Sequence, residues 1–382
     1  MKIAAFNVEN LFDRARAFNI SDNSQTSDIL SAVSELNSLF EKPIYSAADK
    51  ARMIALLIQL DLERSDRGDF VLLRQIRERV VRRPRNGDPI EIIQDGRGDW
   101  VGWAELRTEA VNAVAIMNTG RVMRDVDADI LAVIEAEDRV ALKMFSEMII
   151  AEVGGTPYEQ VMVIDGNDQR GIDVGLMCKR GHSIGLMQSH IHDFKPNGQP
   201  VFSRDCPEYA VTTPAGETIW VLPNHFKSKF GGNDQASRDK REAQARRVAD
   251  IYNRLKSDGH DKVVVLGDLN DTPDSDELAP LLGETDLKEI SDHPSFDTGE
   301  FTGRPGERGI GTYALGNDRD KIDYLLLSPV LFDRVTTSGL FRKGAWPGSR
   351  PPRWTVYPEL TRKVHVASDH HVIWAEIADP GM

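Results

Sequence analysis

An acidic residue and an amide follow a buried segment near the middle of the second half of the chain. The run 263–266 consists of three valines and a leucine, which predicts a short strand buried on both faces, and Gly267 ends it. Asp268 and Asn270 therefore emerge together at the carboxyl end of that strand. A carboxylate and an amide on a fixed backbone can orient a water molecule and hold a phosphate or the base itself. A Gly-Asp turn followed by Asn is also ordinary turn chemistry, so this segment alone identifies no site.

Polar residues stand in the same way at the ends of other predicted strands. Those at carboxyl ends are Asn7, Glu135, His225 and Asp268. Those at amino ends are Asp173, Asp323 and His370. If the second group of strands runs antiparallel to the first, all of these side chains arrive at one edge of the sheets. Buried carboxylates and imidazoles are costly unless they are paired or bound to metal, so the set predicts a functional site.

The elements that must position these residues form an α/β pattern. Apolar or alternating runs predict strands at 2–8, 127–138, 159–164, 173–178, 209–213, 218–222 and 263–266. Helical spacing predicts helices at 108–124 and 234–255. The strand 127–138 presents Glu135 near its carboxyl end, as expected of a strand buried on both faces.

A segment of different character follows the first strand. Apolar residues at helical spacing predict helices around 29–40, 51–62 and 73–80, the last through Leu73, Ile76 and Val80. Residues 90–93 and 100–103 predict a hairpin. We therefore expect a mainly helical insertion at 14–107, with residues 1–13 and 108–382 forming the catalytic domain. The insertion is expected to serve either as a substrate lid or as a surface for a protein partner.

Composition limits the classes of partner. The 382 residues carry a net charge of −13, which argues against broad electrostatic attraction to nucleic acid or anionic membranes. Arginines cluster at 74–85 and lysines and arginines at 227–247, and each cluster is more typical of a solvated helix face than of a binding site. Apolar runs are too short for a membrane span, and the amino terminus lacks the features of a leader, so we expect a cytoplasmic protein without membrane contact.

Seven segments, in order, resemble the motif series of the endonuclease/exonuclease/phosphatase superfamily, also called DNase-I-like. The segments are FNVENLF, DILAVIEAED, RGIDVGLM, NHFKS, VVVLGDLND, KIDYLLLS and ASDHH. They look closest to bacterial nuclease-like members. The resemblance covers residues 1–12 and 108–382. It implies a four-layer αββα sandwich, with two mixed or antiparallel sheets flanked by helices, that hydrolyses phosphate esters with a divalent cation.

The resemblance also implies roles for individual residues. Asp268 would orient or deprotonate the attacking water, positioned by Asn270. His370 would contact the scissile phosphate with its tautomer fixed by Asp323, and His225 would help to neutralise that phosphate. The residues implied as metal ligands are Asn7, Glu135, Asp268, Asn270 and Asp369. Those expected to bind substrate phosphate are Asn7, Arg170, Asn224 and Lys227. Oxygen ligands favour Mg²⁺, with Mn²⁺ as a substitute, over zinc.

Three functions remain open at this point. The first is a metal-dependent endonuclease or exonuclease acting on DNA or RNA, motivated by the motif set, His225 and the local basic stretches. The second is a phosphatase or phospholipase of the same superfamily that acts on an inositol phosphate, sphingomyelin or another small phosphoester. The third is an interaction module with a vestigial site, which the intact set of Glu135, Asp268 and His370 opposes.

Overall fold

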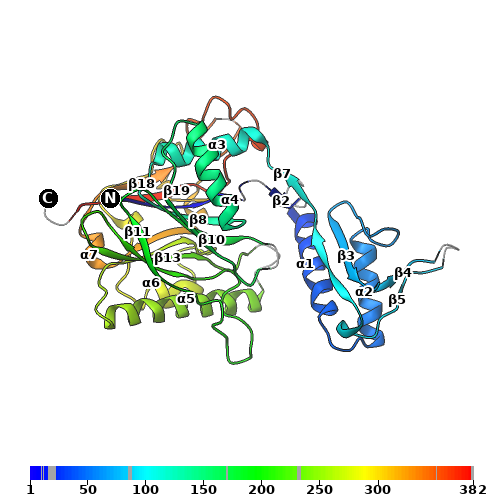
Figure 1. Ribbon diagram of the computed structural model, residues 1–382. Coiled ribbons are helices and arrows are strands. Elements are labelled where there is room, and N and C mark those ends of the chain that lie inside the picture. The colour runs from blue at the N-terminus through cyan, green and yellow to red at the C-terminus, as the bar shows by residue number, and fades with distance from the viewer. Residues whose placement is uncertain are drawn as a thin grey trace. The chain divides into compact units, whose positions relative to one another are not determined.

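The computed structural model describes residues 1–9, 11, 13–15, 23–84, 88–168, 171–229, 234–349 and 351–379. The chain forms two compact units, one from Met1–Phe12 and Val111–Met382 and the other from Asp13–Ala110 (Figure 1). Across the described residues, no helix combines the length and the apolar character needed to cross a membrane.

The larger unit contains two β-sheets. Strands of the first sheet are β1 (Lys2–Asn7), β8 (Ile130–Ala136), β9 (Gln160–Ile164), β10 (Asp173–Cys178), β16 (Phe296–Asp297), β18 (Val335–Phe341) and β19 (Val372–Ile377). Strands of the second are β11 (Ser183–Gln188), β12 (Glu208–Thr212), β13 (Thr218–His225), β14 (Val263–Asp268), β15 (Lys288–Glu289) and β17 (Asp323–Leu327). The first sheet has the order β16-β18-β19-β1-β8-β10-β9, and the second has the order β11-β12-β13-β14-β17-β15.

The two sheets pack face to face because alternate residues of each strand point into one shared apolar layer. In β14, Val264 and Leu266 join this inner layer. Val263 and Val265 point to the opposite face of the same strand. Ile3 and Ala5 of β1 meet the inner layer from the other sheet.

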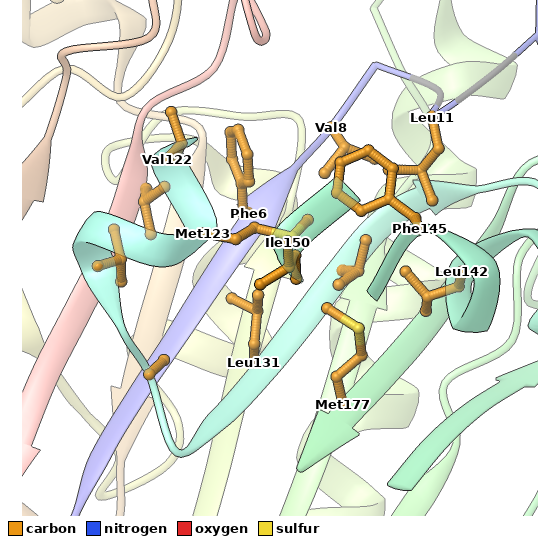
Figure 2. Close-up of a cluster of buried hydrophobic side chains, with 14 of the residues drawn as sticks. Phe6, Val8, Leu11, Val122, Met123, Leu131, Leu142, Phe145, Ile150 and Met177 are labelled. Carbon is orange, nitrogen blue, oxygen red and sulfur yellow. The ribbon is translucent and has the colours of Figure 1, made fainter. Parts of the chain in front are cut away.

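Helices cover the two outer faces. The larger unit's helices are α3 (Ala113–Val126), α4 (Arg139–Met144), α5 (Gln235–Ser257), α6 (Ala279–Leu282) and α7 (Pro329–Phe332). On the first sheet, Phe6 and Leu131 pack with Met123 of α3 (Figure 2). On the second sheet, Val265 packs with Ile251 of α5. The predicted four-layer αββα sandwich is thereby confirmed.

The smaller unit is mixed rather than mainly helical. Its elements are β2 (Asp13–Ala15), α1 (Asn23–Phe40), α2 (Ala47–Gln59), β3 (Val71–Arg77), β4 (Val81–Arg82), β5 (Glu91–Ile92), β6 (Val101–Leu106) and β7 (Thr108–Ala110). The strands form three two-stranded sheets, β2-β7, β3-β6 and β4-β5. Helix α2 begins with a capping box in which Ser46 and Asp49 bond each other's backbone.

Two sequence predictions in this unit are wrong. The helix expected from Leu73, Ile76 and Val80 is strand β3, in which Val71 and Leu73 are buried while Ile76 is 66% exposed. Three apolar residues at helical spacing also fit a strand that alternates and then turns, so their spacing did not discriminate. The expected 90–93/100–103 hairpin does not form either, because β5 pairs with β4 and β6 pairs with β3.

Candidate active site

Three candidate residues form a row across the second sheet. Asp268, the last residue of β14, stands opposite His225 of the parallel strand β13 and opposite Asp323 of the antiparallel strand β17. All three side chains are buried. Gly267 permits this close approach, because a Cβ there would lie 2.2 Å from the carbonyl oxygen of Asn224, and its φ is +123°. The run of apolar residues therefore delivers these polar groups to one sheet edge.

The first sheet contributes to the same edge. Asn7 ends β1, and Glu135 lies one residue before the end of β8. The register between β8 and β10 shifts at Asp173, and Glu135 has a φ of +67°. Such an irregularity re-aims a side chain next to a site and carries backbone strain that the surrounding fold must support.

Side chains from both sheets meet. The Asn7 amide nitrogen donates to Asp268 Oδ2 at 3.2 Å and lies 3.5 Å from His370 Nε2. His225 Nε2 lies 3.6 Å from Glu135 Oε1 and 3.7 Å from Asp268 Oδ2. The structure therefore brings Asn7, Glu135, His225, Asp268 and His370 together around the oxygen atoms of Asp268.

His370 pairs with Asp323, as the family resemblance implies. Its Nδ1 lies 2.8 Å from Asp323 Oδ2, which leaves Nε2 4.0 Å from Asp268 Oδ2 and 3.8 Å from Asp369 Oδ1. Burial by itself lowers the pKa of His370, but the charge of Asp323 and its hydrogen bond, together with the nearby carboxylates, raise that pKa well above its ordinary value. Asp323 therefore favours the cationic form of the imidazole, which can face the charge of a phosphate.

Asp268 must carry a negative charge in a buried place, where water cannot stabilise that charge. Burial raises the pKa of Asp268, and the charge of Asp323 raises it further, to about 7. The backbone N–H of Asn270 donates to Asp268 Oδ1 at 2.8 Å and acts in the other direction. A carboxylate with a raised pKa is well suited to accept a proton from water near neutral pH.

The donor set fits a hard divalent cation. The ligand atoms of Asp268, Asp323 and His370 all lie within 4.8 Å of one another. Asp323 is paired with His370. Glu135 and Asp268 each have a carboxylate oxygen near His225. Carboxylates gathered in a buried place are costly unless a cation compensates them, and oxygen donors suit Mg²⁺ or Mn²⁺. The amide oxygen of Asn7 accepts the Glu9 N–H at 3.1 Å, so metal binding by Asn7 stays a prediction.

The remaining predicted residues occupy different places. Asn270 adopts a φ of +55°, and its side-chain amide donates to the Phe226 carbonyl at 3.2 Å. Asn224 is fully buried and its side-chain amide donates to the Leu222 carbonyl at 2.9 Å, so its contact with substrate stays a prediction. Lys227 Nζ donates to the Ser228 carbonyl at 2.9 Å. Arg170 lies outside the described residues.

Positioning residues that the sequence did not reveal support this cluster. Thr312 Oγ1 accepts the Asp323 N–H at 2.8 Å, and Ser368 Oγ accepts the His370 N–H at 3.0 Å. Lys321 is fully buried, where it pairs with Glu289 at 3.0 Å and contacts the Asp323 carbonyl. The Ser-x-His spacing at 368–370 is a local signal for a hydroxyl that bonds a backbone N–H two residues on. Nothing local marks Thr312, since its partner lies eleven residues away.

Comparison with known proteins shows the family of the chain. Residues 94–343 match the Endonuclease/Exonuclease/phosphatase family. No curated protein gives a match to the chain. Among solved structures, a mannosyl-6-phosphatase from Bacteroides thetaiotaomicron is 14% identical with a TM-score of 0.50, over 70% of this chain and 90% of that one.

Two further solved structures resemble the chain more weakly. An endonuclease/exonuclease/phosphatase family protein from Bacteroides thetaiotaomicron is 13% identical with a TM-score of 0.48, over 69% of this chain and 84% of that one. The human Nocturnin catalytic domain, solved with bound sulfate anion, is 11% identical with a TM-score of 0.46, over 71% and 89%.

Proposed function

Because the chain belongs to the endonuclease/exonuclease/phosphatase family of metal-dependent phosphoesterases, we propose that it is a nuclease that hydrolyses phosphodiester bonds of DNA or RNA. The proposal rests on contacts among Asn7, Asp268 and His370. The atoms concerned lie within 4.0 Å of one another along these contacts, although the residues come from different sheets and loops. The site therefore combines a carboxylate that can accept a proton with imidazoles that can face a phosphate.

The residues of the cluster divide the chemistry between them. Asp268 orients a water molecule and takes its proton as the water oxygen bonds to phosphorus. The ester bond opposite the incoming oxygen breaks and leaves its electron pair on the departing oxygen, which takes a proton from solvent, so the products are a phosphomonoester and an alcohol. His370, held by Asp323, donates a hydrogen bond to the phosphate oxygens as negative charge develops on them, and His225 faces the same group.

A divalent cation completes this assignment. Glu135, Asp268 and Asp369 would hold it, with amide oxygens of Asn7 and Asn270. Such an ion, when bound, polarises the phosphate oxygens and compensates the negative charge of the carboxylates. We propose Mg²⁺ as this ion and Mn²⁺ as its substitute, since the ligands are oxygen atoms.

A second candidate, hydrolysis of a small soluble phosphoester, is favoured by one observation about charge. Most cations of the two basic stretches have acidic partners, among the residues that the structure describes. The pairs are Arg74–Glu105, Arg82–Glu91, Arg83–Asp66, Lys229–Asp271, Arg238–Glu277, Arg241–Asp271, Arg246–Glu242 and Arg247–Asp193. Paired cations give little long-range attraction for a polyanion, whereas a small substrate such as a sugar phosphate needs none. The fold of this chain also resembles that of the mannosyl-6-phosphatase.

A substrate panel separates these candidates. The wild-type protein and Asp268→Asn are assayed with single- and double-stranded DNA, RNA, bis(p-nitrophenyl) phosphate and p-nitrophenyl phosphate, with Mg²⁺ or with EDTA. We expect Mg²⁺-dependent cleavage of a nucleic acid and of the diester, lost in EDTA and in the variant. Release of inorganic phosphate from the monoester without any nucleic-acid cleavage would replace the nuclease by the phosphatase. The variant guards against a contaminating nuclease.

A further inference from the structure

Four basic residues gather beside the candidate active site. They form what we call the cationic cluster, which consists of Lys195, Arg204, Lys227 and Lys240. Helix α5 carries Lys240 and fixes the segments that carry Lys227 and Lys195. Lys240 lies one helical turn before Gln244, whose side-chain oxygen accepts the Lys227 N–H at 2.9 Å. Lys227 and Lys240 are therefore neighbours across this contact.

The same face of α5 fixes the loop that carries Lys195. Arg247, one turn beyond Gln244, contacts Asp193 Oδ2 through Nε at 2.7 Å. Two residues later, the Lys195 N–H donates to the Gln199 carbonyl at 2.8 Å and closes a turn. The loop that carries Lys195 is therefore bonded to the helix that carries Lys240.

Arg204 connects the cluster to the catalytic groups. Its side chain is 2% exposed, and it contacts Asp168 Oδ2 at 3.1 Å and donates to the Phe226 carbonyl at 2.5 Å. The same carbonyl accepts the side-chain amide of Asn270 at 3.2 Å. A single peptide oxygen therefore joins Arg204 to a residue that bonds Asp268.

The cluster holds more positive than negative charge. Burial, together with the charges of Arg204, Lys195 and Lys227, lowers the pKa of Lys240 to about 8, and the charge of Asp168 acts in the opposite direction. Among the described residues, the Lys240 ammonium has neither an ion pair nor a hydrogen bond. Asp168 compensates one of the four positive charges, and partly buried like charges repel each other unless further anions lie among them. This excess stands out in a chain whose net charge is −13.

We propose that the cationic cluster binds a second phosphate group of the substrate, next to the phosphate that is cleaved. The inference rests on the proposed function and narrows it, because a nucleic-acid strand presents a phosphate at every nucleotide whereas a simple monoester has only one. Arginine and lysine together suit this ligand, since the guanidinium offers a fixed pair of donors and the ammonium groups add charge.

The first test compares Lys240→Gln with Lys256→Gln, a control on the same helix whose lysine pairs with Asp286 instead. Each is assayed with a short oligonucleotide and with bis(p-nitrophenyl) phosphate, which has a single phosphate. In Lys240→Gln, we expect the oligonucleotide KM to rise about tenfold, with the ratio of oligonucleotide to small-diester kcat/KM falling about tenfold. The control should keep the wild-type ratio. An unchanged ratio in Lys240→Gln, while the oligonucleotide is still cleaved, would overturn the inference and leave the nuclease proposal intact.

A second measurement needs no turnover. The lysines are reductively methylated with ¹³C, and the Lys240 signal, assigned through Lys240→Gln, is titrated with pH in EDTA, with and without inorganic pyrophosphate. We expect pyrophosphate to raise the pKa of Lys240 above about 8. No shift at saturating pyrophosphate would contradict phosphate binding at the cluster. A raised pKa of Lys240 in pyrophosphate, combined with no effect of Lys240→Gln on oligonucleotide cleavage, would show that the cluster binds small polyphosphates. That result would overturn the inference that the cluster binds a neighbouring phosphate of the strand.

Discussion

His370 shows how much of a catalytic residue's behaviour is set by its partners. The contact of Nδ1 with Asp323 determines that Nε2 is the nitrogen facing Asp268. The strand pattern places both residues at amino ends of apolar strands, and the family resemblance implies that they pair. It does not predict Thr312 or Ser368, whose hydroxyls accept the backbone N–H groups of Asp323 and His370. Hydroxyl residues are common in loops, so residue type marks neither of them, and only the Ser-x-His spacing at 368–370 gives a local signal.

Removal of His370 or Asp268 should slow catalysis strongly without unfolding the protein. We expect His370→Ala and Asp268→Asn each to reduce kcat by at least about a hundredfold, as losses of acid–base and electrostatic groups usually do. The exposed His192 provides the control, and His192→Ala should retain the wild-type rate. Thermal unfolding followed by circular dichroism checks the fold. Wild-type turnover in a folded His370→Ala or Asp268→Asn would remove that residue from the mechanism.

Asp173 should make stability depend on pH. Burial raises its pKa from 3.8 to about 6, even though it accepts the Gly166 N–H at 2.7 Å. Between these values the folded protein binds more protons than the unfolded chain, so stability falls as pH rises. Asp173→Asn removes this loss and should be more stable than the wild type by about 1–2 kcal/mol near pH 7.5, with the gain vanishing below about pH 4. Urea unfolding at both pH values measures it, and a gain that is largest in acid would contradict the sign.

At the scale of elements, buried strands were predictable and the small sheets of the insertion were not. Val263–Asp268 forms a strand buried at every position, and such a continuous apolar run is hard to mistake. Strand β3 instead alternates for only a few residues, and its arginines suggested a solvated helix. The positive φ angles of Glu135 and Asn270 could not be foreseen either, because the bulge and the turn that impose them depend on the neighbouring strands.

At the scale of elements, the site depends on Gly267 of β14. In Gly267→Ala, the added Cβ would lie 2.2 Å from a backbone oxygen of β13, at a φ of +123°. We expect a loss of about 2–5 kcal/mol in the free energy of unfolding, from strain and overpacking together, and a loss of hydrolysis because β13 and β14 separate. Gly216→Ala is the control, since Gly216 has a φ of +80° but open space around it. Equal, small effects of the two substitutions would refute this explanation.

At the scale of the whole molecule, two compact units raise the question of what the smaller one adds. Asp13 stands opposite Ala110 in the β2-β7 pair, so the two ends of the inserted segment lie side by side. We propose that the insertion selects substrates or partners and takes no part in the chemistry.

Excision of the insertion tests this division. Replacing residues 13–110 with a short Gly-Ser linker should leave a unit that unfolds cooperatively and hydrolyses bis(p-nitrophenyl) phosphate within about threefold of the wild-type rate. Loss of nucleic-acid cleavage alone would favour a substrate lid, and unchanged cleavage of both substrates would favour a partner surface. A folded excision variant that is inactive on the small diester would contradict the proposal.

The central claim is that the two sheets deliver carboxylates to a single divalent cation, Glu135 from the first and Asp268 from the second. Mn²⁺ binding, followed by the electron paramagnetic resonance signal of the free ion, tests it in the intact protein. We predict one tight site in the wild type and in the surface control Glu147→Gln, with at least about tenfold weaker binding in both Glu135→Gln and Asp268→Asn. Wild-type affinity in either of these two folded variants would contradict the claim.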